Sequence, residues 1–297
     1  DKKLSAGVVA TVGTLGVIIP PSVTLIILGI LMEQSIGQLF LAGIVPGLII
    51  AALFIGVIYF WSKIDPNIAP KSERFNWRER IKSLPEVCWV LIVFLLIIGG
   101  IIEGFFTPTE AAAVGTFAVL ILTIIKKDIT FKKYILSVKE SLRTAIMLLM
   151  LIVGSTVFGH FIAITNIPQI AADWVTSLNV NRYMVMILIC LIYELGGSFI
   201  DDLAFLIFAT PIFYPIVVKL GFHPLWFGIV IGVVAMIGVV IPPVAICVFV
   251  VKNIAKIPMG TIYKGVLPFL ISLVFIWILL FIFPELALWL PSLFFKI

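Results

Sequence analysis

Two stretches near opposite ends of the chain decide how it folds: TLGVIIPPS (Thr14–Ser22) and MIGVVIPPV (Met236–Val244). Each places a glycine and a double proline inside an apolar segment. Proline lacks a backbone N–H and displaces the carbonyl of the preceding turn, so a helix that contains this motif is interrupted there. Unpaired backbone is tolerated within a membrane only where protein buries it or where it lines a cavity.

The composition identifies the environment of the chain. Of its 297 residues, 62% are hydrophobic and 12% are charged, and the mean hydropathy is +1.27. This composition excludes a soluble globular domain and predicts an all-α polytopic membrane protein. The chain starts at Asp1 without an initiator Met, so we expect a fragment or processed chain that lacks upstream material. Its three cysteines lie in apolar runs without metal-site or redox spacing.

Two basic loops set the topology. Lys and Arg are concentrated between Trp61 and Val87 and again between Ile125 and Ser141, and they account for most of the net charge of +5. By the positive-inside rule, both loops are cytoplasmic. The membrane edge therefore explains the charge, and we expect no nucleic-acid partner.

The apolar segments around these loops give the expected order of elements. The end of a first repeat fills 1–61, a basic loop 62–86, connecting helices 87–182, a second repeat 183–283 and a C-terminal interfacial segment 284–297. Within these regions we expect a broken helix (3–30), a helix (39–61), connecting helices (87–104, 109–125, 141–165), an interfacial piece (168–178), a re-entrant hairpin (183–220), a second broken helix (225–251) and a last helix (262–283). Thr109 is expected to cap its helix.

The stretch 183–220 is too long for one span. About 38 residues would make a helix of roughly 57 Å. Its middle reads ELGGSFIDD, with paired glycines and two adjacent acids. A hairpin that enters from outside, turns near mid-membrane at Gly196–Asp202 and returns outside accounts for the length. It also keeps every basic cluster on one side of the membrane.

The two interrupted segments form an internal repeat. They align without gaps at an offset of 222 (238 − 16), which pairs Gly16 with Gly238, Pro20 with Pro242, Pro21 with Pro243, Gly43 with Gly265 and Pro46 with Pro268. The topology sends the first copy from inside to outside and the second from outside to inside. Inverted repeats with broken helices are typical of secondary transporters, in which freed carbonyls coordinate Na⁺ near the midplane.

Several motifs resemble the large membrane (M) subunit of the tripartite ATP-independent periplasmic (TRAP) transporters. They are GTLGVIIPPS, SIGQLFLAGIVPG, GFFTPTEAAAVG, the GGSFIDD…TPIFYP run and IGVVIPP, in matching order over essentially the whole chain. The resemblance implies that the N-terminal third of a typical large subunit, including a first hairpin with a serine-rich tip, is not part of this sequence.

The resemblance implies an inverted-repeat, elevator-type transporter of the bacterial inner membrane. Its substrate would be an organic acid such as a C4-dicarboxylate, sialic acid or another sugar or keto acid. Na⁺ would be the coupling ion, and no other cofactor is expected. A periplasmic binding protein would deliver the substrate, and a small membrane (Q) subunit would accompany the chain in the lipid bilayer.

The resemblance also implies two sodium sites, each between a hairpin tip and the unwound stretch of a broken helix. One would use Ser198 and Gly196 with Gly238, Val239 and Pro243. The other would use the backbone around Gly13, Thr14 and Gly16, with partners from the absent first hairpin. Coupling or substrate-site candidates are Asp202, Asp201, Pro20, Pro21, Ser22 and Pro242.

Asp201 and Asp202 fall at the expected mid-membrane turn, where an ionised carboxylate is costly and indicates function. We favour Asp202, because similar transporters carry an acid just after this tip. The alternative is a hairpin cap satisfied by nearby N–H groups. A bare carboxylate would repel an anionic substrate, so the acid is expected to serve Na⁺ or the structure of the tip. Glu194, one turn earlier, is left open between capping, pairing and function.

Three other functions compete with this hypothesis. A Na⁺-coupled dicarboxylate-type symporter with the same inverted-hairpin plan would work without a binding protein. An intramembrane enzyme would explain acids next to glycines, but the chain contains neither HExxH nor GxSG, and we expect no enzyme. A scaffold or channel would show no Na⁺-dependent uptake.

Overall fold

The computed structural model describes residues 1–68, 77–127, 129–166 and 180–295, together with Ile170, Asp173 and Ser177. Within these residues every regular element is a helix. The helices are α1 (Lys2–Val12), the 3₁₀ helix η1 (Gly13–Val17), α2 (Val23–Leu31), α3 (Ile36–Ile64), α4 (Trp77–Ile102), α5 (Pro108–Ile125), α6 (Phe131–Ile164), α8 (Arg182–Phe199), α9 (Asp202–Lys219), α10 (Pro224–Gly238), α11 (Ile246–Ala255), α12 (Met259–Ile282) and α13 (Glu285–Phe294).

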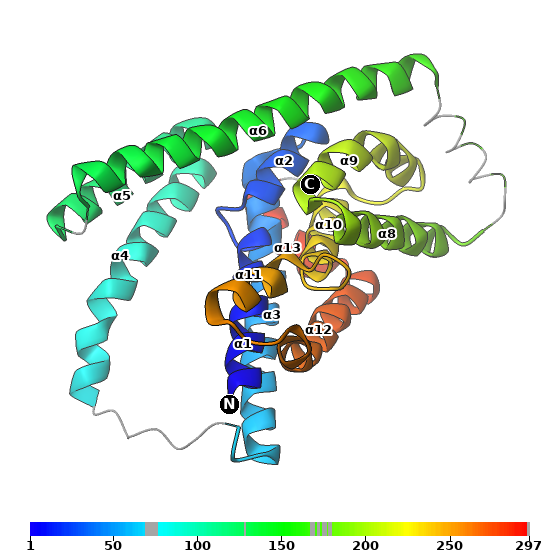
Figure 1. Ribbon diagram of the computed structural model, residues 1–297. Helices are drawn as coiled ribbons and strands as arrows, with labels where there is room; N and C mark the ends of the chain where they lie inside the picture. Colours follow the sequence, from blue (N-terminus) through cyan, green and yellow to red (C-terminus); the bar gives the residue numbers. More distant parts are fainter. Residues whose placement is uncertain are drawn as a thin grey trace. The chain divides into compact units, whose positions relative to one another are not determined.

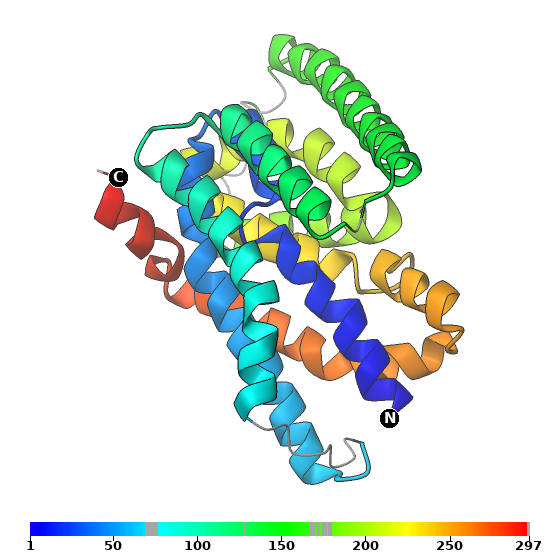
Figure 2. The ribbon, with the colours of Figure 1, turned by 90° about the vertical axis from the view of Figure 1, so that its left-hand side faces the viewer.

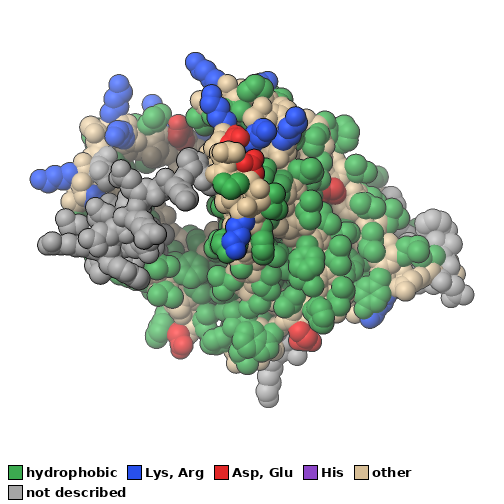
Figure 3. All heavy atoms as spheres, turned by 90° about the horizontal axis from the view of Figure 1, so that it is seen from below, with side chains coloured by type: hydrophobic (Ala, Val, Ile, Leu, Met, Phe, Trp, Pro, Cys, Tyr) green, Lys and Arg blue, Asp and Glu red, His purple; other side chains and the backbone are tan. Residues whose placement is uncertain are grey.

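Six helices in the described part of the chain are long and apolar enough to cross a membrane: α3, α5, α6, α8, α9 and α12. Their outer surfaces are apolar too, as shown by Phe117 on α5 and Met150 on α6, which are 63% and 70% exposed. Hydrophobic side chains cover most of the face seen in Figure 3. Exposed apolar surface on this scale marks contact with lipid rather than water. The expectation of an all-α polytopic membrane protein is confirmed.

The chain divides into two compact units. Asp1–Pro70 and Val157–Ile297 form the first, and Lys71–Thr156 form the second. The first unit contains both interrupted helices, the α8–α9 hairpin and α12. The second contains α4, α5 and most of α6.

The half-helix α10 forms the centre of the first unit. Every residue from Leu225 to Gly238 is buried. The helices α2, α3, α8 and α12 all pack against α10, and Figure 1 shows the α8–α9 hairpin beside it. Trp226 donates its indole N–H to the carbonyl of Leu280 at 2.7 Å, which satisfies its polar atom inside an apolar core.

Glycines allow two close approaches between helix backbones in this unit. The helix α1 runs across α12 (Figure 2), and a methyl group added at Gly265 would lie 2.0 Å from the carbonyl oxygen of Lys3. A methyl group at Gly43, the repeat counterpart of Gly265, would lie 2.3 Å from the carbonyl oxygen of Ile18. Small residues commonly let membrane helices approach this closely.

The second unit corrects one capping prediction. The N-cap of α5 is Thr107, not Thr109, and its hydroxyl accepts the Glu110 backbone N–H at 3.3 Å. The Glu110 carboxylate in turn accepts the Thr107 backbone N–H at 2.8 Å. This reciprocal T-x-x-E capping box satisfies two orphan donors, and Pro108 fits the first helical position because it needs no N–H partner.

Several helices differ in length from the sequence-based expectation. The helix α6 starts at Phe131 rather than 141, and α4 starts at Trp77 rather than 87. The extra turns of α6 read FKKYILSVKE, which contains no glycine or proline to stop a helix. The expected interfacial piece 168–178 lies outside the described residues except for Ile170, Asp173 and Ser177.

Candidate functional site

Regular helical structure stops at both motifs. In the first copy, α1 gives way to η1 at Gly13, and α2 begins only at Val23. In the second copy, α10 ends at Gly238 and α11 begins at Ile246. Both Pro–Pro peptide bonds, Pro20–Pro21 and Pro242–Pro243, are cis.

The α8–α9 hairpin turns within two residues. Ile200 is extended and donates its N–H to the carbonyl of Gly196 at 3.0 Å. Asp201 caps α9, because its carboxylate accepts the N–H of Ala204 at 3.0 Å. Of the two alternatives for the acidic pair, capping therefore describes Asp201. Asp202 follows in the first turn of α9.

The Asp202 side chain folds back over the end of α8. A methyl group added at Gly197 would lie 2.7 Å from Asp202 Oδ1. The other glycine of the pair, Gly196, faces the ring of Phe205, which leaves no room for a side chain either. Gly197 was missed as a site residue, although the paired glycines in ELGGSFIDD were its signal.

The tip of the hairpin lies against the second interruption. Val244 donates its backbone N–H to the carbonyl of Ser198 at 3.2 Å. A methyl group at Gly238 would lie 3.7 Å from the carbonyl carbon of Gly197, 3.8 Å from Asp202 Oδ1 and 3.9 Å from the carbonyl oxygen of Glu194. The hairpin and the broken helix, far apart in sequence, thus meet around Gly238.

Oxygen atoms gather at this meeting point. The Ser198 hydroxyl donates to the Glu194 carbonyl at 2.7 Å, and its own lone pairs stay available to a cation. The Val239 carbonyl accepts the N–H of Cys247 at 3.2 Å, which leaves a second lone pair. One carboxylate oxygen of Glu194 is buried and has no hydrogen-bond partner among the described residues.

The helix ends at the meeting point favour a cation. The helices α8 and α10 both end there, and the C-terminus of a helix carries a partial negative charge. The opposing N-terminus of α9 is neutralised by the cap from Asp201 and by Asp202 in its first turn. Backbone oxygens, a hydroxyl and these dipoles form an environment suited to Na⁺.

The first interruption is more open. A methyl group added at Gly13 or Gly16 would meet no other atom within 4 Å, and both glycines are exposed. The hydroxyl of Thr14 is used locally, since it donates to the Thr11 carbonyl at 2.7 Å. The hydroxyl of Ser22 donates to the Val17 carbonyl and caps α2 by accepting the N–H of Leu25 at 3.3 Å.

The predicted site residues therefore fall into two groups. The structure brings together those of the second copy, namely Ser198, Gly238, Val239 and Asp202, with Gly196, Asp201, Pro242 and Pro243 as chain neighbours. Those of the first copy lie along one interrupted helix: Gly13, Thr14, Gly16, Pro20, Pro21 and Ser22. Among the described residues, no three His, Cys, Asp or Glu side chains cluster as a transition-metal site would require.

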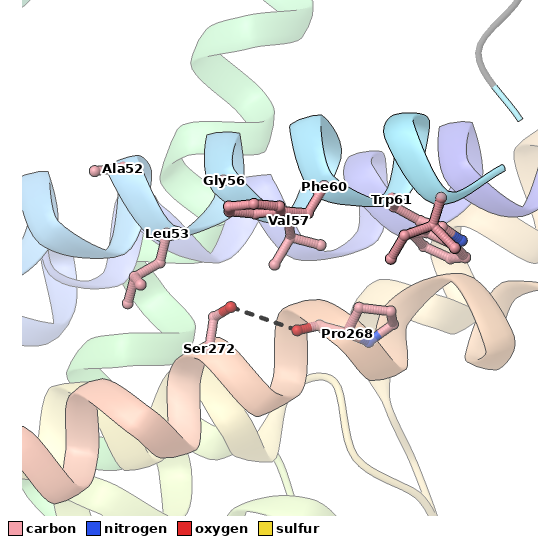
Figure 4. Close-up of a pocket in the computed structure, with 9 residues that line it drawn as sticks. Ala52, Leu53, Gly56, Val57, Phe60, Trp61, Pro268 and Ser272 are labelled. Carbon is pink, nitrogen blue, oxygen red and sulfur yellow. Dashed lines mark hydrogen bonds between the residues drawn. The ribbon is translucent and has the colours of Figure 1, made fainter. Parts of the chain in front are cut away.

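A pocket of about 460 Å³ lies elsewhere, between α3 and α12 (Figure 4). It is lined by Ala52, Leu53, Gly56, Val57, Phe60, Trp61, Ile64, Pro268 and Ser272. The hydroxyl of Ser272 donates to the Pro268 carbonyl at 3.4 Å. The lining is almost entirely apolar, so this pocket does not suit an organic acid, and we assign no substrate to it.

Interrupted helices that meet a helical hairpin inside a membrane-spanning fold are typical of secondary transporters. Residues 1–286 match the family described as "Tripartite ATP-independent periplasmic transporter, DctM component". The chain belongs to this family of TRAP transporter large permease subunits, as the sequence motifs predict.

Named relatives support this assignment. The chain is 37% identical over 292 residues to the sialic acid TRAP transporter large permease protein SiaM of Vibrio cholerae, covering 98% of this chain and 68% of the relative. It is 33% identical over 288 residues to the C4-dicarboxylate TRAP transporter large permease protein DctM of Pseudomonas aeruginosa, covering 97% and 67%. It is 34% identical over 281 residues to the ectoine TRAP transporter large permease protein TeaC of Halomonas elongata, covering 94% and 65%. The chain thus spans about two thirds of the length of these relatives.

Proposed function

We propose that this chain acts in Na⁺-coupled import of an organic acid across a bacterial inner membrane. The observation that carries the proposal is a backbone hydrogen bond. The N–H of Val244 donates to the carbonyl of Ser198, which holds the hairpin tip against the second interruption. A Na⁺ ion at this point would be bound by the Ser198 hydroxyl and by carbonyls of Gly238 and Val239, with Gly196 and Pro243 as further candidates. Binding would tie the hairpin to the broken helix.

An acidic substrate is supported by two observations. The relatives named above include transporters of C4-dicarboxylates and of sialic acid. In addition, α11 begins without a side-chain cap at Ile246, three residues after Pro243, and helix N-termini favour negative charge.

The partners and the movement belong to the same proposal. A periplasmic binding protein would deliver the substrate, a small Q subunit would sit beside this chain in the bilayer, and the hairpin with its broken helices would move as an elevator. An elevator predicts that a cysteine in place of Ile200, an exposed residue at the tip of the hairpin, reacts with a membrane-impermeant thiol reagent from each side in turn as substrate and Na⁺ are changed. Labelling from one side only under all conditions would exclude this movement.

Sodium coupling is tested by uptake into proteoliposomes that contain the complete transporter, measured against external Na⁺. In Ser198→Ala, the Na⁺ concentration for half-maximal uptake should rise roughly tenfold, which corresponds to about 1.4 kcal/mol of lost binding. The matched control is Ser62→Ala, because the Ser62 hydroxyl makes the same local bond, to the Ile58 carbonyl at 2.6 Å. Unchanged Na⁺ dependence in Ser198→Ala would refute the site, and an equal shift in both variants would make it nonspecific.

The same assay separates the second candidate, a symporter that works without a binding protein. Omitting the periplasmic protein should abolish uptake if the proposal is correct. Full uptake without it would establish the alternative.

A further inference from the structure

The helix α6 is longer than a membrane span. Its 34 residues would extend about 51 Å, against roughly 30 Å for the hydrocarbon core of a bilayer. Residues 144–164 contain no Lys, Arg, Asp or Glu and suffice to cross that core on their own. All charges of α6 lie in its first part, residues 131–143, so this part lies beyond the hydrocarbon core.

Two stripes run along this first part of α6. At about 100° per residue, Phe131, Ile135, Val138 and Leu142 fall within roughly 60° of one another and form an apolar stripe. Lys132, Lys139 and Arg143 fall within roughly 40° of one another and form a basic stripe. The two stripes are about a quarter-turn apart, so the basic stripe borders the apolar one.

Both stripes are unpartnered in the described part of the chain. Phe131 is 77% exposed and Leu142 is 56% exposed. The ion pair found among the described residues joins Lys219 and Asp173, so no described carboxylate forms an ion pair with Lys132, Lys139 or Arg143. Apolar side chains this exposed are unfavourable in water. Glu140, on the neighbouring face of the same segment, offsets one of the three cations, and the remaining positive charge repels itself unless further anions lie nearby.

A membrane surface that carries anionic lipids satisfies both stripes at once. An amphipathic helix buries its apolar side at the boundary between headgroups and acyl chains. Lys and Arg at the border of that side extend their stems along the boundary and place their charges at the level of the phosphates. Lys126 and Lys127, just after α5, add to the same positive region, and the positive-inside rule places it in the cytoplasmic leaflet.

We propose that residues 131–143 of α6 bind anionic phospholipids, with phosphate headgroups on the basic stripe and acyl chains along the apolar stripe. This site is independent of the sodium site and of the substrate. It would hold one end of α6 at the cytoplasmic surface of the membrane while residues 144–164 cross it.

The test compares two spin-labelled lipids, phosphatidylglycerol and phosphatidylcholine, around the complete transporter in phosphatidylcholine vesicles. Electron paramagnetic resonance measures the fraction of each lipid that the protein immobilises. The wild type should prefer phosphatidylglycerol. In the triple variant Lys132→Gln, Lys139→Gln, Arg143→Gln, the ratio of immobilised phosphatidylglycerol to immobilised phosphatidylcholine should fall about fivefold. The control triple Lys252→Gln, Lys256→Gln, Lys264→Gln removes the same charge elsewhere on the chain and should keep most of it.

Two further measurements guard against misfolding and against a different ligand. The charge-preserving triple Lys132→Arg, Lys139→Arg, Arg143→Lys should keep the preference, and added salt should weaken it in the wild type. Inorganic phosphate at matched ionic strength should not displace the lipid, and displacement would indicate a site for free phosphate instead. Three results would overturn the proposal. The first two are no preference in the wild type and an equal loss of preference in both neutralised triples. The third is that the triple Lys132→Gln, Lys139→Gln, Arg143→Gln keeps its lipid selectivity but no longer binds the small membrane subunit.

Discussion

The two interrupted helices carry the same motif in different surroundings. At the second interruption, Gly238 is buried against the hairpin tip, and Val244 is bonded to Ser198. At the first, the equivalent Gly16 is exposed, and Ser22, the counterpart of Val244, caps the next half-helix itself. The motif therefore opens the backbone in both copies, but among the described residues a hairpin tip packs against the opening only in the second, where we propose the Na⁺ site. The predictions below test this comparison.

The largest effect is expected at the glycines that differ in their contacts. Gly265→Ala should destabilise the protein by about 3 kcal/mol or more, because the added methyl group meets the Lys3 carbonyl at 2.0 Å and backbone cannot easily move away. Thermal unfolding in detergent measures the loss. Gly260→Ala, on the same helix with nothing within 4 Å, is the control. Equal stability of the two variants would show that α1 and α12 do not pack this closely.

A smaller effect should separate the two interruptions themselves. Gly238→Ala places a methyl group among the atoms of the hairpin tip, so the Na⁺ concentration for half-maximal uptake should rise roughly fivefold, or about 1 kcal/mol. Gly16→Ala should change it much less, because the methyl group meets no atom within 4 Å. If both variants shift the Na⁺ dependence equally, the first interruption of the working transporter is as closely covered as the second.

Ser22 caps its half-helix and its counterpart Val244 does not, and this difference predicts an effect of about 1 kcal/mol on the free energy of unfolding. Ser22→Ala removes the N-cap of α2 and leaves the Leu25 N–H without its acceptor, which should lower the free energy of unfolding by about that amount. Val244→Ser should bring no matching gain, because Ala245, in the left-handed conformation, occupies the N-cap of α11. Chemical denaturation of both variants decides this, and a clear stabilisation by Val244→Ser would contradict it.

The smallest effect concerns the start of each broken helix, where Asp1 and His223, again 222 residues apart, cap α1 and α10 in the same way. Asp1 accepts the N–H of Lys3 at 2.8 Å, and His223 Nδ1 accepts that of Leu225 at 3.2 Å. Burial lowers the pKa of His223, so the neutral ring is the form that caps.

The His223 ring binds a proton more readily in the unfolded chain than in the folded one. The contribution of its cap to the free energy of unfolding is therefore complete above about pH 6.5 and is lost as the pH falls. The loss should amount to about 0.5–1 kcal/mol. It appears as a fall in Tm with acidification that is smaller in His223→Asn, whose amide oxygen caps at either pH. The same pH dependence in both proteins would assign it to other groups.

The sequence predicted the elements that depend on local chemistry. Helix-breaking prolines placed both interruptions, and the length of the 183–220 stretch led to the hairpin seen as α8 and α9. Contacts between segments that are distant in the sequence could not be predicted in this way. That Gly197 faces Asp202, or that Gly265 packs on α1 while Gly43 packs on Ile18, depends on how helices pack. The sequence alone does not reveal the Asp1–His223 correspondence, because an acid and an imidazole share only the ability to accept a capping hydrogen bond.

The burial of α10 limits how its end at Gly238 can be displaced. With every residue from Leu225 onward enclosed, this half-helix has no free face along which it could slide past its neighbours. Moving it alone would open cavities on several sides, and close-packed interiors resist that strongly. Any motion that carries Gly238 must therefore take α8 and the other helices packed around α10 along as one rigid block.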